Sequence, residues 1–81
     1  MMHPDQIKQL ILAGMACDYL SLDGDGHHFE AFIVSSEFVG KSRVQRQQHV
    51  NKILKDKFDS GELHALSFKT LTPEEWSAQR G

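Results

Sequence analysis

The chain has 81 residues, enough for one small domain, and its 40% hydrophobic and 25% charged content is ordinary for a globular protein. A single cysteine excludes an internal disulfide, and no apolar run approaches the roughly 20 residues of a membrane span. The net charge of -2 conceals a basic segment at 41–57, where Asp56 is the only acid. We therefore expect a single cytoplasmic domain, 1–81, with no membrane partner.

The first half of the chain predicts a helix followed by a β-hairpin. Pro4 suits the first helical position, and apolar residues recur at helical spacing as far as Met15. From Cys17 the apolar pattern changes to a period of two, and the Asp and Gly residues at 23–26 form a turn signal. A second strand, at about 28–35, then completes the predicted hairpin.

The second half predicts a helix, a strand and a short helix. Ser42 is a suitable cap for a helix that ends near Asp59, and a third strand follows at about 63–69. Residues 72–75 form a capping box with proline at the first helical position, and the helix it opens carries Trp76. The order α-β-β-α-β-α predicts a two-layer α+β domain, with a three-stranded sheet packed on helices.

Motifs for catalysis are incomplete throughout the chain. Gly40-Lys41-Ser42 imitates the end of a phosphate-binding loop, but Ser35 stands where that loop needs its first glycine. No serine lies in a Gly-x-Ser-x-Gly elbow, and neither Cys-x-x-Cys nor His-Glu-x-x-His spacing occurs. We therefore predict that the protein is not an enzyme and has no closed zinc site of its own.

Three histidines are the candidate metal ligands. His27 and His28 lie at the hairpin, and His64 is expected on the third strand. If that strand pairs beside the hairpin, two imidazoles come close together and leave coordination positions open for a second protein. Neighbouring strand residues point to opposite faces, so at most one of His27 and His28 is expected to bind. The competing interpretation is that His64 is a half-buried packing residue.

Several spaced motifs together carry a resemblance to a known family. They are Gly24-Asp25-Gly26-His27-His28-Phe29, Ile33-Val34-Ser35, Phe38-Val39-Gly40-Lys41-Ser42, His64-Ala65-Leu66-Ser67 and Thr72-Pro73-Glu74-Glu75-Trp76. In this order the sequence resembles the BolA family, and Arg46-Gln47-Gln48 is typical of its IbaG-like branch. The resemblance covers nearly the whole chain and implies a KH-like fold of the second type.

The resemblance also implies a function in iron-sulfur cluster trafficking or iron sensing, and in the response to stress. Family members form heterodimers with monothiol glutaredoxins that bridge a [2Fe-2S] cluster, to which glutaredoxin and glutathione supply thiolates. His64 matches the family's histidine ligand. The second ligand comes from the hairpin loop, where Asp25 stands at the position of a cysteine or histidine in many relatives. We prefer His27 to His28 there, and expect the apo protein to be a monomer or weak homodimer.

The alternative function is that of a DNA-binding transcriptional regulator. KH-like folds bind single strands, and the basic segment 41–57 supplies the positive charge that phosphate contacts require. Its candidate contacts are Lys41, Arg43, Arg46 and Lys52. However, the Gly-x-x-Gly loop of KH domains is replaced by residues 40–43, which lack the second glycine, and we expect no exposed aromatic pair for base stacking.

Overall fold

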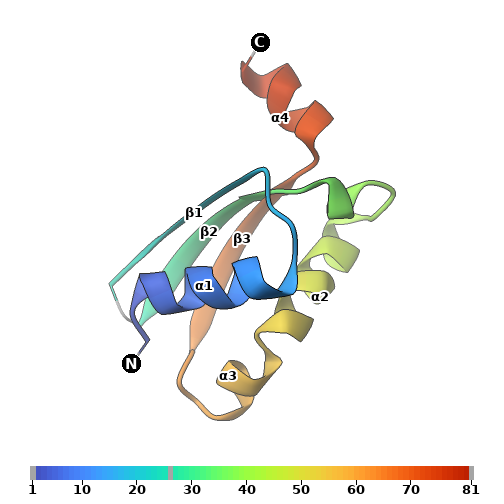
Figure 1. Cartoon of the computed structure of the whole chain (residues 1–81). Helices are drawn as coiled ribbons and strands as arrows, with labels where there is room; N and C mark the ends of the chain where they lie inside the picture. Colours follow the sequence, from blue (N-terminus) through green and yellow to red (C-terminus); the bar gives the residue numbers. More distant parts are fainter. Residues whose placement is uncertain (1, 26, 81) are drawn as a thin grey trace.

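The computed structural model describes residues 2–25 and 27–80, which form a sheet with helices packed on it (Figure 1). The elements, in chain order, are α1 (Pro4–Gly14), β1 (Tyr19–Gly24), β2 (His28–Val34), the 3-10 turn η1 (Ser36–Phe38), α2 (Arg43–Ile53), α3 (Lys55–Asp59), β3 (Ala65–Leu71) and α4 (Pro73–Arg80). The predicted α+β order and three-stranded sheet are confirmed. Across the described ranges, no helix is long and apolar enough to cross a membrane.

The sheet has the order β1-β2-β3 and is mixed. β1 and β2 form the predicted antiparallel hairpin, whereas β3 runs parallel to β2 after the crossover through α2 and α3. In this register His28 at the start of β2 lies opposite Ala65 at the start of β3. The hairpin end of β2 and the beginning of β3 therefore share one end of the sheet.

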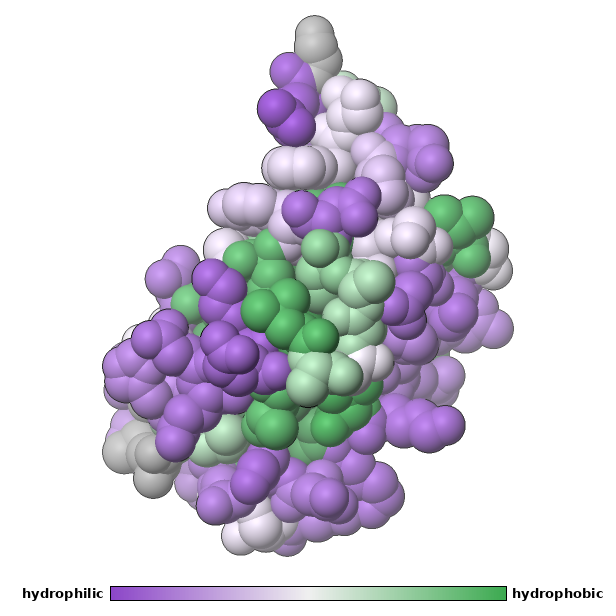
Figure 2. Space-filling model, viewed as in Figure 1, coloured by the Kyte–Doolittle hydropathy of each residue, from purple (hydrophilic) through white to green (hydrophobic). Residues whose placement is uncertain are grey.

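Alternate residues of the strands separate the two faces of the sheet. Phe29, Ala31 and Ile33 of β2 are buried on the face that α1 and α2 cover. The helices contribute Ile7, Ile11, Val50 and Leu54 to the same core. Figure 2 shows this side of the molecule, with hydrophobic groups gathered in the middle and hydrophilic residues around them.

The second face of the sheet carries exposed polar residues and an aromatic cluster. Glu30 and Lys69 are exposed there, and Tyr19 is 44% exposed. The Tyr19 ring stacks on Trp76 of α4, with ring centroids 5.2 Å apart and an interplanar angle of 24°. An exposed tyrosine thus stacks on a partly buried Trp76, because α4 brings Trp76 back beside the first strand.

Two of the predicted boundaries that differ from the structure have an identifiable physical reason. The single helix expected to end near Asp59 is divided at Leu54, where φ is -98° and ψ is 6°, and Leu54 itself is fully buried. β3 begins at Ala65, two residues later than predicted, because the N–H of Leu63 donates to the Lys57 carbonyl at 3.0 Å. His64 consequently lies immediately before the strand and not on it.

Candidate metal-ligand site

His28 and His64 line one shallow cavity beside the first residues of β3. Both side chains belong to exposed residues, and the parallel register places His28 opposite the neighbour of His64. The other lining residues are Gln47, Asn51 and Phe58 from the helices and Ala65, Leu66, Ser67 and Phe68 from β3. A hairpin histidine and His64 thus line the same cavity, and the hairpin residue is His28.

The two imidazoles in this cavity form few hydrogen bonds within the protein. The His28 Nε2 atom lies 3.4 Å from Ser67 Oγ, at the long limit of a hydrogen bond. The His64 side chain forms no hydrogen bond with the residues that the structure describes. A neutral imidazole nitrogen is a good ligand for iron, zinc and copper, so this pair has the chemistry of a partial metal site.

His27 is also exposed but does not line the cavity. Its backbone and that of His28 are held by the side chain of Asp25, whose Oδ1 accepts their N–H groups at 2.9 and 2.8 Å. The N–H of Asp25 donates in return to the His28 carbonyl at 3.2 Å. The N–H groups that donate to its side chain, that of His28 first and then that of His27, lower the pKa of the Asp25 carboxyl below its ordinary value.

Asp25 therefore has a positioning role that the sequence analysis missed. From the sequence, Asp25 is notable because it stands where many relatives have a cysteine or histidine ligand. An aspartate at the start of a turn is nevertheless a known signal for hydrogen bonds from backbone N–H groups to its side chain. Its carboxylate fixes the backbone at the start of β2.

Other potential ligands do not join the two histidines. Cys17 lies between α1 and β1, and partial burial, followed by the charges of Glu37 and Asp18, raises the pKa of its thiol. Among residues 2–25 and 27–80 there is no group of three or more His, Cys, Asp or Glu that could hold a metal ion. The cavity offers two imidazoles, and its lining includes no cysteine, aspartate or glutamate.

Arg46, a candidate phosphate contact, is instead a structural residue. Its Nε donates to the Lys41 carbonyl at 3.0 Å, and one terminal nitrogen donates to the Thr70 carbonyl at 3.2 Å. Both terminal nitrogens also donate to the Glu75 carboxylate, at 2.7 and 3.3 Å. With its side chain only 13% exposed, Arg46 connects α2, β3 and α4.

Glu75 completes this connection from α4. Its Oε1 accepts the Thr72 N–H at 2.8 Å, and its own N–H donates to Thr72 Oγ1 at 3.1 Å, which is the predicted capping box. The hydrogen bond from Arg46, followed by that from the Thr72 N–H, lowers the pKa of Glu75 to about 2. Most of this carboxylate's acceptor capacity is therefore used inside the protein.

The remaining residues of the basic segment differ in availability. The Lys41 Nζ donates to the Glu37 carbonyl at 3.2 Å. Arg43 and Lys52 are exposed and form no ion pair within the described part of the chain. Gly40 has a φ of 79°, a left-handed conformation that lets the chain turn into the Ser42 cap of α2. The structure thus leaves two of the four candidate phosphate contacts unpaired.

Comparison with known proteins identifies the family. The family model for BolA-like proteins matches residues 12–75, a range that contains the three candidate histidines, Arg46 and Glu75. The chain belongs to the BolA-like family. This BolA-like protein is 33% identical over 79 residues to the acid stress protein IbaG of Escherichia coli K12. The alignment covers 98% of this chain and 94% of the relative. The predicted family is confirmed, and the IbaG relative agrees with the predicted branch.

A second relative and two solved structures extend the comparison. The chain is 31% identical over 83 residues to the DNA-binding transcriptional regulator BolA of Haemophilus influenzae, covering 90% of this chain and 80% of the relative. A BolA homologue from Coxiella burnetii is 38% identical with a TM-score of 0.83, covering 95% and 99% of the two chains. A bol-like protein from Babesia bovis is 28% identical with a TM-score of 0.87, covering 100% and 96%. The BolA-like fold is therefore shared along the whole chain.

Proposed function

We propose that this BolA-like protein is a non-catalytic adaptor that shares a [2Fe-2S] cluster with a monothiol glutaredoxin, in iron-sulfur cluster trafficking or iron sensing. The observation that carries the proposal is the pairing of His28 and His64 in one exposed cavity. Neither ring has a strong hydrogen-bond partner among the described residues, so both are free to bind a ligand. The role is proposed for the cytoplasm, during stress, with an apo protein that is a monomer or weak homodimer.

The donor set of the cavity fits a shared cluster. A [2Fe-2S] cluster takes four ligands, and this chain offers two imidazoles that line one cavity. The remaining two ligands would be thiolates from glutaredoxin and from glutathione. When bound in this way, the cluster supplies one-electron chemistry at a potential that neutral imidazole ligands raise.

Within the site, His64 is the first ligand and a hairpin histidine is the second. His28 is favoured over His27 because it lines the cavity of His64 and follows a backbone segment held by Asp25. His27 remains the alternative, since it is exposed and lies next to the turn. Asp25 acts as a positioning residue, because its Oδ1 accepts two backbone N–H groups of the histidine pair.

The proposal is tested by adding the protein to a glutathione-loaded [2Fe-2S] monothiol glutaredoxin and recording visible circular dichroism. We expect a new cluster spectrum that saturates at equal amounts of the two proteins. The His64→Ala variant should abolish it, and His28→Ala should weaken it. His3→Ser is the matched control, because it removes an exposed imidazole but keeps a residue that caps α1.

Two outcomes decide the ligands and the proposal separately. If His27→Ala weakens the spectrum and His28→Ala does not, the second ligand is His27 and the shared site stands. If neither His64→Ala nor the hairpin variants change the spectrum, or if no spectrum forms with the wild type, the adaptor function at this cavity is wrong.

A second candidate function is DNA binding through the basic segment. The similarity to a DNA-binding transcriptional regulator and the unpaired side chains of Arg43 and Lys52 favour it. Two phosphate contacts would give a plot of log affinity against log salt with a slope of about -1.8 on duplex DNA. Binding without salt dependence, or unchanged binding by Arg43→Gln and Lys52→Gln, would contradict this candidate.

A further inference from the structure

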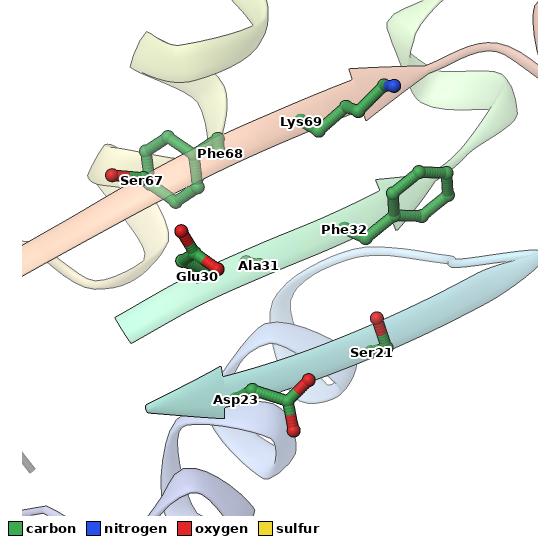
Figure 3. A pocket seen from close by; sticks show the side chains of 8 residues that line it. All are labelled: Ser21, Asp23, Glu30, Ala31, Phe32, Ser67, Phe68 and Lys69. Atoms are coloured by element: carbon green, nitrogen blue, oxygen red, sulfur yellow. The ribbon is translucent and has the colours of Figure 1, made fainter. Parts of the chain in front are cut away.

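The sheet face opposite α1 and α2 carries a shallow groove, which shares only Ser67 and Phe68 with the cavity of His28 and His64. It consists of two neighbouring cavities that share Ser21 and Phe32, and we call it the open-face groove. Besides Ser21 and Phe32, the first cavity is lined by Asp23, Glu30, Ala31, Ser67, Phe68 and Lys69. The second cavity is lined by Tyr19, Trp76 and Arg80 in addition to the same two residues. Figure 3 shows the acids of the first cavity toward one end and Phe32 and Lys69 toward the other.

One end of the open-face groove is aromatic and cationic. Phe32 meets the stacked Tyr19 ring edge-on, with centroids 5.8 Å apart. The Arg80 guanidinium lies 4.5 Å from the centroid of the Trp76 ring, and the Lys69 Nζ lies 5.8 Å from that of Phe32. Neither cation forms an ion pair with the residues that the structure describes. Apolar ring surface and two unpaired cations are thus presented together.

The other end of the groove is acidic. Asp23 and Glu30 lie directly opposite each other on β1 and β2, and both are exposed. Like charges in this position weaken a strand pair, and neither carboxylate forms an ion pair with a described cation. Folding therefore gains nothing from this carboxylate pair, while a basic side chain placed between the two would relieve their repulsion.

We propose that the open-face groove binds an extended peptide segment of a protein partner, with a basic residue at one end, an apolar residue next and an acidic residue at the other end. The basic side chain fits Asp23 and Glu30, the apolar side chain fits the ring cluster, and the carboxylate fits Arg80. Nucleic acid fits less well, because a phosphate chain along the groove would meet both carboxylates. This inference is independent of the cluster proposal and concerns the apo protein.

The length of the groove sets the length of the segment. Asp23, Ser21 and Tyr19 follow one another on the same face of β1. Four residues of strand at about 3.3 Å each span roughly 13 Å, so an extended segment of about five or six residues reaches from the acids to the rings. A longer partner is bound through this short segment and keeps its own fold outside it.

The test uses the blocked peptide acetyl-Lys-Lys-Thr-Leu-Glu-Glu-amide and isotope-labelled apo protein. Amide and indole spectra should show saturable shifts at the groove residues, including Trp76, the single tryptophan of the chain. The peptide acetyl-Lys-Glu-Leu-Thr-Lys-Glu-amide has the same composition without separated charges, and should bind several-fold more weakly. A deoxythymidine hexanucleotide serves as the nucleic-acid probe.

Charge-removing variants locate the site without disturbing the core. Arg80→Gln and Glu30→Gln change exposed residues and should each weaken peptide binding about threefold, the amount typical of one exposed ion pair. Lys8→Gln, on α1 and outside the groove, is the matched control and should leave binding unchanged. Equal binding of both peptides, shifts confined to other surfaces, or binding of the oligonucleotide but not the peptide would each overturn the proposal.

Discussion

Arg46 and His64 are both expected from the sequence to contact a ligand, yet the fold uses them in opposite ways. Arg46 donates to two backbone carbonyls and one carboxylate and is only 13% exposed on its side chain. His64 is exposed and makes no side-chain hydrogen bond with the described residues. A charged or polar residue is thus available for function only to the extent that folding leaves its polar atoms unpaired.

The two surroundings explain the difference. Arg46 lies where α2 passes the end of β3 and the start of α4, so its planar guanidinium reaches acceptors from all three elements. His64 precedes β3 after the turn that Leu63 closes, and the cavity next to it lies open to solvent. Arg46 thus belongs to the scaffold, whereas His64 belongs to the surface that the scaffold presents.

The largest effect on stability is expected from Arg46→Ala. The change leaves the carbonyls of Lys41 and Thr70 without their donor and removes the partner of Glu75. A hydrogen-bonded charged group of this kind contributes about 2 kcal/mol, so Tm should fall by about 10 °C. Urea denaturation and thermal melting measure the two quantities.

Arg43→Ala is the matched control for that variant. Arg43 is exposed on the same helix and forms no ion pair with a described residue, so its loss should change the free energy of unfolding by less than about 0.5 kcal/mol. Equal stability of the two variants would show that Arg46 is not a scaffold residue and would return it to the group of candidate phosphate contacts.

The next effect concerns pH and the partner of Arg46. The pKa of Glu75 is about 2 in the folded protein, below its ordinary value of 4.5, so the folded state favours the carboxylate. The stabilisation is fully present above pH 4.5 and is lost as pH falls from 4.5 toward 2. The stability difference between wild type and Glu75→Gln should therefore shrink over this range, as followed by urea denaturation at each pH.

The Arg46→Ala background supplies the control for the pH experiment. Without its guanidinium partner Glu75 should titrate closer to its ordinary pKa, and Glu75→Gln should then alter the acid limb of the stability curve much less. If the difference persists unchanged in that background, the low pKa has another cause than Arg46.

The role of Glu75 shows how much of the fold local sequence can predict. The Thr72–Glu75 capping box follows from spacing alone and is present as predicted. The bond between Glu75 and Arg46 joins residues 29 apart, and no local pattern predicts it. The helix break at Leu54 is not predicted by local sequence either. No helix-breaking residue stands there, and the break accompanies the burial of the Leu54 side chain in the core.

The candidate site divides in the same way. Turn chemistry predicts the hairpin, and residue type selects the three histidines. That His28 lines the same cavity as His64 depends on the parallel register of β2 and β3, which no single segment encodes. Likewise, Tyr19 and Trp76 are far apart in the sequence, so their stacking could be predicted only once the arrangement of β1 and α4 in the fold was known.

A smaller and local effect is expected from Asp25→Ala. The variant removes the acceptor for the N–H groups of His27 and His28, while its exposed position spares the core. Hydrogen exchange measured by NMR should become several-fold faster at these two amides and stay unchanged in β3. Asp23→Ala is the matched control, since Asp23 accepts no such bonds from a described residue. Equal exchange in the two variants would remove Asp25 from its positioning role.

The smallest effect on stability is expected from His64→Ala, and this variant tests whether folding leaves the His64 side chain unused, in contrast to that of Arg46. An exposed ring without a described hydrogen-bond partner contributes little to folding, so the free energy of unfolding should change by less than about 0.5 kcal/mol, as for Arg43→Ala. Urea denaturation measures this, and the cluster titration measures function on the same sample. A loss as large as that of Arg46→Ala would make His64 a packing residue. Unchanged stability together with a lost cluster spectrum would show that its imidazole is reserved for a ligand.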